Sequence, residues 1–175
     1  FFFGALLLWC APVFSQQSAN KPEREQWFMD MGLGMFIHWS VDVQVGAVIS
    51  HSMAGASDAY LEKFTKTLPQ TFNPKKFDPE EWAILAKLAG MKYVVFTTKH
   101  HAGFCMWDTK TTDFNIMRTP FKRDALKEII AAFRKQGIAI GLYFSPEDFY
   151  YFYQHKLPIG RMQVPQHFPA NNPGL

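Results

Sequence analysis

Three stretches of the chain are apolar and then end in polar or aromatic side chains. They cover residues 32–39, 91–101 and 138–145. The second contains a β-branched and aromatic run without alternation, residues 93–98, which is typical of a parallel strand buried on both faces. At their ends these stretches carry His38 and Trp39, His100 and His101, and Tyr143 and Ser145. Because ligands bind beyond the carboxyl ends of parallel strands in α/β proteins, the pattern predicts one shared pocket.

Two amphipathic segments separate these strands and predict helices. The first opens at Asp78, a natural N-cap, followed by Pro79 and by two glutamates whose charges favour a helix N-terminus. Its expected apolar face consists of Trp82, Leu85, Ala86, Leu88 and Ala89. The second runs over residues 123–136, with apolar side chains at helical spacing and Gly137 as its C-cap. The resulting βαβαβ order predicts a parallel sheet with right-handed crossovers.

A long segment, residues 40–73, separates the first strand from the first helix. A short helix is expected within it at residues 57–67. A connection of this length is typical of a functional rim rather than of a simple link between elements.

The two ends of the chain predict an exported protein that continues further. Residues 1–16 are apolar and finish with small residues, without an initiating Met or a basic start. We interpret them as a truncated secretory signal peptide, too short to span a bilayer comfortably, followed by a polar linker at 17–26. We therefore expect a periplasmic or secreted protein. Residues 165–175 contain no closing element, so residues 27–175 are expected to be the first part of a larger domain that extends past Leu175.

Composition narrows the function classes only slightly. The net charge is +3 and the lysines and arginines are dispersed, so nucleic-acid binding is not indicated. Aromatic residues are abundant at 17%, and many fall in expected loops such as residues 149–153. They either stack on a ligand such as a sugar ring or pack the loops onto the strands. Cys105 is expected to be unpaired, because the other cysteine, Cys10, lies in the signal peptide.

The histidines at the strand ends have two chemical interpretations. Three imidazoles could bind zinc, but neighbours on an extended strand point to opposite faces, so His100 and His101 would share an ion only if the chain turned between them. The spacings HExxH and HxH are also absent. Hydrogen bonds from these histidines and His38 to the hydroxyls of a polar ligand explain the same layout without that difficulty. We interpret the remaining candidates, His51, His155 and His167, as packing residues.

Five blocks of sequence carry a resemblance to a known family. They are MGLGMFIHW at 31–39, FNPKKFDPEEW at 72–82, AGMKYVVFTTKHHAGFCMWD at 89–108, KRD at 122–124 and GLYFS at 141–145. In this order and spacing they resemble the α-L-fucosidases of glycoside hydrolase family 29. The resemblance implies a (β/α)8 barrel, of which this chain would hold about three strands, and release of L-fucose from fucosylated glycans with retention at the anomeric carbon. It implies no cofactor and no metal.

The resemblance also implies roles for individual residues. His38, His100, His101 and Tyr143 match positions that bind the fucose hydroxyls, and Trp39 and Trp107 match positions that flank the pocket. Two departures from the family pattern occur. Ala102 replaces an aspartate that commonly follows the paired histidines, and the usual Glu-Trp segment of the rim is not evident, so Ser50 or His51 is a candidate for part of its role.

No catalytic carboxylate is expected within residues 1–175, because the resemblance implies that the nucleophile and the acid/base come after Leu175. Asp78, Glu80 and Glu81 are expected to open a helix at the opposite, amino-terminal face of the barrel, and Asp124 to cap the second helix. Asp108, Glu147 and Asp148 lie near the correct rim but are not expected to be catalytic.

Three alternatives to this function stay open. The first is a related exo-glycosidase with another sugar preference. The second is a non-catalytic sugar-binding or scaffold protein, which would apply if the natural chain ended at Leu175. The third is a metal-dependent hydrolase that uses the histidine cluster.

Overall fold

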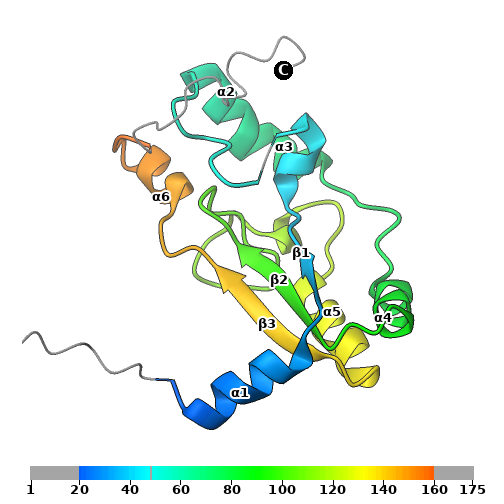
Figure 1. Cartoon of the computed structure of the whole chain (residues 1–175). Helices are drawn as coiled ribbons and strands as arrows, with labels where there is room; N and C mark the ends of the chain where they lie inside the picture. Colours follow the sequence, from blue (N-terminus) through cyan, green and yellow to red (C-terminus); the bar gives the residue numbers. More distant parts are fainter. Residues whose placement is uncertain (1–19, 48, 160–175) are drawn as a thin grey trace, which may run out of the picture. The chain divides into compact units, whose positions relative to one another are not determined.

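A computed structural model describes residues 20–47 and 49–159 of the chain (Figure 1). The chain divides into two units, Phe1–Asp30 and Met31–Leu175. Helix α1, Pro22–Met31, carries acidic residues in its first turn and occupies part of the segment expected to be a linker. The expected signal peptide lies outside the described residues. None of the helices in the described part of the chain has the length and apolar character needed to cross a membrane.

The second unit is built on a three-stranded parallel sheet, as predicted. Its strands are β1 (Gly34–Ile37), β2 (Tyr93–Lys99) and β3 (Ala139–Phe144), in the order β1-β2-β3. Together with the helices between them, they have the arrangement of the first part of a (β/α)8 barrel. The carboxyl ends of β2 and β3 point toward the end of the sheet where α2, α3 and α6 lie (Figure 1).

The two predicted helices are present, with the predicted N-caps. Helix α4 spans Pro79–Leu88, and the Asp78 carboxylate accepts a hydrogen bond from the backbone N–H of Glu81 at 3.0 Å. Helix α5 spans Ala125–Lys135, and the Asp124 carboxylate accepts one from Lys127 at 2.8 Å. These bonds satisfy backbone donors that the first turn of a helix cannot pair internally. The helices pack against each other, and α5 packs against β2 and β3.

The buried face of α4 matches the prediction only in part, at Ala86. Ala83 and Ala86 are fully buried, whereas Leu85 and Leu88 are 55% and 79% exposed. Helical periodicity locates an apolar stripe but does not determine which flank faces the neighbouring elements. The small alanines allow close approach, and the leucines lie on a flank that no described element covers.

The start of α4 also lies at a different edge of the sheet than expected. Trp39, two residues after β1, stacks on Phe77, which comes just before α4, with the ring centres 5.5 Å apart. Asp78, Glu80 and Glu81 therefore begin a helix at the carboxyl edge of β1, not at the opposite face. The reason is geometric, because a helix that follows a parallel strand starts where that strand ends and runs back along it.

The long connection between β1 and α4 holds several short helical segments. It contains η1 (Val41–Val45), α2 (Asp58–Glu62), the π-helical turn η2 (Lys63–Thr67) and α3 (Leu68–Thr71). The predicted short helix at 57–67 is confirmed. A second short turn, η3 (Ile116–Arg118), lies between β2 and α5.

The aromatic run at residues 149–153 forms helix α6 (Phe149–Gln154), so the prediction of a loop there is wrong. The Asp148 carboxylate caps α6 by accepting a hydrogen bond from the Tyr151 N–H at 2.9 Å. Phe149 is fully buried and Tyr150 stacks on Phe114 at 4.3 Å. Phe149 and Tyr150 therefore pack the segment onto its neighbours, which is the second of the two roles considered for these aromatic residues.

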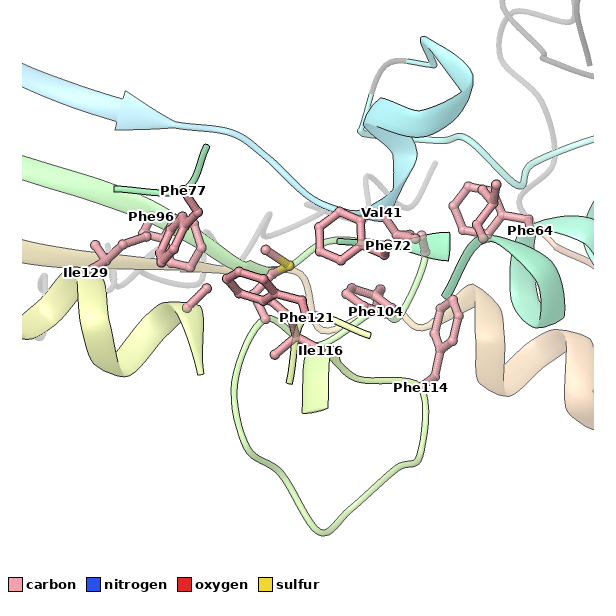
Figure 2. Close-up of a cluster of buried hydrophobic side chains, with 14 of the residues drawn as sticks. Val41, Phe64, Phe72, Phe77, Phe96, Phe104, Phe114, Ile116, Phe121 and Ile129 are labelled. Carbon is pink, nitrogen blue, oxygen red and sulfur yellow. The ribbon is translucent and has the colours of Figure 1, made fainter. Parts of the chain in front are cut away.

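A cluster of aromatic rings joins the connections to the sheet. Figure 2 shows the buried rings running from Phe77 and Phe96 through Phe104 to Phe114 and Phe64. Phe104 contacts Phe72 at 5.8 Å and Phe114 at 5.1 Å, so the β1–α4 and β2–α5 connections share one core. Each fully buried Phe contributes about 1.5–3 kcal/mol relative to exposure. This core holds the connections in place at the carboxyl ends of the strands.

Candidate functional site

The register of the sheet brings His38, Thr97 and Tyr143 to one face. Ile37 pairs with Phe96, so His38 is opposite Thr97, and Thr97 in turn pairs with Tyr143. Side chains at paired positions of neighbouring strands point to the same face. The Nδ1 atom of His38 and the Oγ1 atom of Thr97 are 2.7 Å apart, which is a hydrogen bond.

The chain turns directly after β2 and brings the paired histidines together. The pairing of β2 with β3 is irregular between Thr97 and Lys99, and the Gly103 N–H donates to the His100 carbonyl at 2.9 Å. The rings of His100 and His101 have their centres 4.7 Å apart. The expectation that these side chains point to opposite faces is therefore wrong, because it assumed an extended strand at this position.

The hydrogen bonds of His100 determine which ring nitrogen carries the proton. The backbone N–H of His101 donates to His100 Nδ1 at 2.8 Å, so Nδ1 is unprotonated. The neutral ring then carries its proton on Nε2, which lies 3.2 Å from the Tyr143 hydroxyl and can donate to it. The two rings also stack, with centres 5.1 Å apart. Tyr143 and His100 are thus joined by both a hydrogen bond and a ring contact.

Burial keeps the cluster neutral. Burial, followed by the nearby imidazoles of His101, His38 and His51, lowers the pKa of His100 to about 4. Burial also lowers the pKa of His38. For His101, burial and then His51 lower the pKa, while the Glu147 carboxylate opposes them. At neutral pH these rings are uncharged hydrogen-bonding groups.

Lys99, which the sequence interpretation did not place in the site, lies beside it together with Glu147 and Asp148. Lys99 is only 5% exposed; its Nζ donates to the Glu147 carbonyl at 3.1 Å and lies 3.3 Å from an Asp148 carboxylate oxygen. Glu147 Oε2 is 3.3 Å from His101 Nδ1 but is not aligned for a hydrogen bond, and within the described residues that nitrogen has no hydrogen-bond partner. A lysine at the end of a buried strand needs a hydrogen-bonding or charged partner, so its position in the sequence could have indicated that Lys99 is paired.

His51 lies beside the cluster, although the residue pattern alone suggested a packing role and only the family resemblance offered a role at the rim. Its ring centre is 4.8 Å from that of His101, and Ser50 Oγ lies 2.6 Å from its Nδ1. The residue lies on a connection and not on a strand, so strand-end reasoning could not place it. His155 instead lies against Tyr151 beyond α6, with ring centres 4.1 Å apart. His167 lies outside the described residues.

The two tryptophans are placed differently from the histidines. Trp39 contacts the rings of Phe72, Phe77 and Trp82, and among the described residues no ring contact joins it to a histidine. Trp107 is half-buried and makes no ring contact within the described part of the chain. The described portion therefore brings together His38, His100, His101 and Tyr143 but does not bring either tryptophan against them.

The donor set does not favour a metal. Among residues 20–47 and 49–159, no three His, Cys, Asp or Glu side chains are placed to hold one ion. His100 uses both nitrogens within the protein, and the thiol of Cys105 is free and buried, with a pKa raised to about 12 by burial. Neutral imidazoles, a phenol and aromatic faces instead suit a neutral ligand with several hydroxyls.

The position expected for the catalytic carboxylates is not covered by the structure. Leu175, after which they are predicted, lies outside the described residues, as does the whole segment from residue 160 onward. Their placement after Leu175 therefore stays a prediction. Within the described ranges, the carboxylates beside the histidine cluster are those of Glu147 and Asp148, and both contact basic side chains.

Comparisons with known proteins agree on one family. The family model described as Alpha-L-fucosidase matches residues 13–170. The tissue α-L-fucosidase of Mus musculus is 35% identical over 144 residues, covering 74% of this chain and 32% of the mouse protein.

Solved structures show the same similarity. The α-L-fucosidase isoenzyme 1 from Paenibacillus thiaminolyticus has 40% identity and a TM-score of 0.63, covering 72% of this chain and 29% of that one. An α-L-fucosidase from Bacteroides thetaiotaomicron, trapped as a covalent intermediate with 2-fluoro-fucosyl fluoride, has 37% identity and a TM-score of 0.62, covering 77% and 32%. The chain thus spans about a third of the length of these relatives.

Proposed function

Since the chain belongs to the α-L-fucosidase family, we propose that it supplies the fucose-binding part of a retaining exo-α-L-fucosidase that acts on fucosylated glycans. We further propose that the protein is exported. The observation that carries the proposal is the neutral cluster of His38, His100, His101 and Tyr143 at the carboxyl ends of three adjacent strands. His38, His101 and Tyr143 each keep a donor or an acceptor for a sugar hydroxyl, and His100, whose two ring nitrogens are engaged within the protein, would orient Tyr143.

The cluster would bind the sugar and orient it for reaction. Retaining hydrolysis requires two carboxyl groups about 5 Å apart, one as nucleophile and one as acid/base. Glu147 and Asp148 are the nearest carboxylates among the described residues, but Asp148 is paired with Lys99 and caps α6, and Glu147 is beside His101. We therefore expect both catalytic carboxylates after Leu175. Hydrogen bonds to the sugar hydroxyls would hold the anomeric carbon in place for them.

An activity assay of the full-length protein tests the proposal. We expect hydrolysis of 4-nitrophenyl α-L-fucoside, with α-L-fucose as the first anomer detected by proton NMR. Binding of fucose without hydrolysis would support the non-catalytic sugar-binding alternative. Faster hydrolysis of a different α-glycoside would support an exo-glycosidase of another preference.

Chelation separates the fucosidase from the metal-dependent alternative. We expect kcat/KM of the full-length protein to be unchanged after dialysis against EDTA, because one ring nitrogen each of His38, His51 and His100 is already engaged by Thr97, Ser50 and Tyr143. Loss of activity that zinc restores would support a metal-dependent hydrolase instead.

A further inference from the structure

The imidazole of His51 reaches the histidine cluster from a different element than the other members. It lies on the β1–α4 connection, with its ring centre 4.8 Å from that of His101 and 6.0 Å from that of Phe149. The connection therefore forms one side of the cluster that no strand end supplies.

The backbone around His51 is anchored, although the side chain is exposed. Ile49, Ser52, Met53 and Ala54 are buried, and the Ala54 N–H donates to the His51 carbonyl at 3.0 Å. A polar side chain on an anchored turn loses little conformational freedom when it binds a ligand.

One ring nitrogen of His51 is engaged and the other is available. Ser50 Oγ lies 2.6 Å from Nδ1, and within the described residues no hydrogen bond reaches Nε2. When the serine donates, Nε2 carries the proton and is a donor; when the serine accepts, Nε2 is an acceptor. A ligand hydroxyl can pair with either form, because it both donates and accepts.

Charge determines the class of ligand. Burial and the neighbouring imidazoles disfavour a positive charge on His100 and His101. The nearby cation, Lys99, is already bound to Asp148 and to the Glu147 carbonyl. The surroundings of His51 therefore suit a neutral saccharide better than an anion.

We propose that His51, held by Ser50, is a further sugar-binding residue that contacts a hydroxyl adjacent to the one bound by His101. It thereby determines which neutral saccharides the site accepts. This inference rests on the proposed function, since it requires a fucoside bound at the cluster.

The test combines a substitution with substrates that lack single hydroxyls. In the full-length protein, His51→Ala should lower kcat/KM for 4-nitrophenyl α-L-fucoside by roughly ten- to a hundred-fold. On the one deoxy-fucoside that lacks the contacted hydroxyl, the same substitution should change kcat/KM by less than about threefold, because there is no bond to lose. Ser50→Ala should show the same substrate pattern with a smaller loss.

Controls separate the possible results. His155→Ala removes an exposed imidazole next to Tyr151 and should leave kcat/KM unchanged. Unchanged kinetics for His51→Ala in an active protein would overturn this inference alone, and so would an equal loss on every deoxy substrate. If His51→Ala does not fold, the substrate pattern of Ser50→Ala decides by the same criteria. A wild-type protein that neither cleaves nor binds fucosides would overturn the proposed function together with the inference.

Discussion

His38 and His101 differ in their protein contacts, and both have hydrogen-bonding capacity left for a ligand. His38 is exposed and bonded to Thr97, and His101 is half-buried with Nδ1 facing Glu147. Neither ring is part of the hydrophobic core. Their substitution should therefore affect ligand binding more than folding.

We expect His38→Ala or His101→Ala in the full-length protein to lower kcat/KM about ten- to a hundred-fold, equivalent to about 1–3 kcal/mol. The physical reason is loss of one hydrogen bond to a fucose hydroxyl in a partly dry site. His155→Ala is the matched control and should have little effect. Thermal unfolding should change only slightly in all three variants. If His38→Ala and His101→Ala melt the protein while the surviving fraction keeps normal kinetics, these are core histidines.

A second residue-scale prediction concerns Asp42, a fully buried carboxylate in η1. In the described structure its two oxygens have no hydrogen-bond partner, and Ser52 Oγ and Tyr60 Oη also lack one. The Ser40 and Ser52 hydroxyls are near enough to favour the charged form, but they are not aligned with it. Burial dominates and raises the pKa of Asp42 from 3.8 to about 6.

The sign of the pH dependence follows from this shift. Between pH 3.8 and about 6 the folded state binds more protons at Asp42 than the unfolded state does. The free energy of unfolding therefore falls as the pH rises through this range. Above pH 6 the whole loss is present, up to about 3 kcal/mol. Asp42→Asn should raise the free energy of unfolding by about 1–3 kcal/mol near pH 8 and by almost nothing near pH 4. Denaturant melts of the full-length protein at both pH values measure it. An equal effect at both values would mean that charge is not the cause.

At the scale of elements, the sequence predicted those features that depend on neighbouring residues in the chain, namely the helix starts and the strands. The caps Asp78 and Asp124 mark the starts of α4 and α5 because their hydrogen bonds are made within one turn. The three strands follow from their apolar runs. The flank of α4 that is buried depends on its neighbours, which are distant in sequence, and could not be read from periodicity. The start of α6 did have a local signal, its cap Asp148, but the aromatic run after it was interpreted as a loop.

In the site, too, features set by nearby residues could be predicted, and features set by residues distant in sequence could not. Strand ends predicted His38, His100, His101 and Tyr143 in one place, because parallel strands end at the same edge. The turn at His100 depends on the irregular pairing of β2 with β3, which no sequence pattern indicates. His51 reaches the cluster through a long connection whose path is set by the buried aromatic residues.

Lys99 connects β2 to the segment before α6, and this contact is testable at the element scale. We expect Lys99→Met to leave Asp148 without its cation and to free the Glu147 carbonyl, at a cost of about 1–3 kcal/mol after allowance for the partial exposure of Asp148. Hydrogen exchange should rise at residues 145–154. The exposed pair of Lys66 and Glu62 provides the control, since Lys66→Met should not change exchange there. Unchanged exchange in Lys99→Met would mean that the backbone bonds alone hold this segment.

At the scale of the whole molecule, the described sheet leaves apolar surface uncovered. Phe36, Leu142 and Phe144 are each more than half exposed, and β1 and β3 are edge strands of the three-stranded sheet. Open edges with apolar faces favour association between chains. The chain spans only about a third of the length of its relatives, so the covering elements are expected elsewhere in the protein.

We therefore expect residues 1–175, produced alone, to aggregate or to unfold without a cooperative transition. Size-exclusion chromatography and calorimetry measure this directly. A monomer that melts in one sharp transition would show that three strands and their helices are sufficient for a stable domain.

The layers on the inner face of the sheet have one more consequence. Below the His38, Thr97 and Tyr143 layer, Phe36 lies 5.4 Å from the His38 ring, and Tyr93 fills the space above Gly34, where an added Cβ would be 2.3 Å from its ring. On these three strands the rings of Phe36 and Tyr93 therefore lie beneath the cluster, on the side away from the carboxyl ends. Under the proposed function, the released fucose and the fucosyl unit of the next substrate bind the same cluster. Free L-fucose, held by the same imidazoles, is thus expected to act as a competitive product inhibitor.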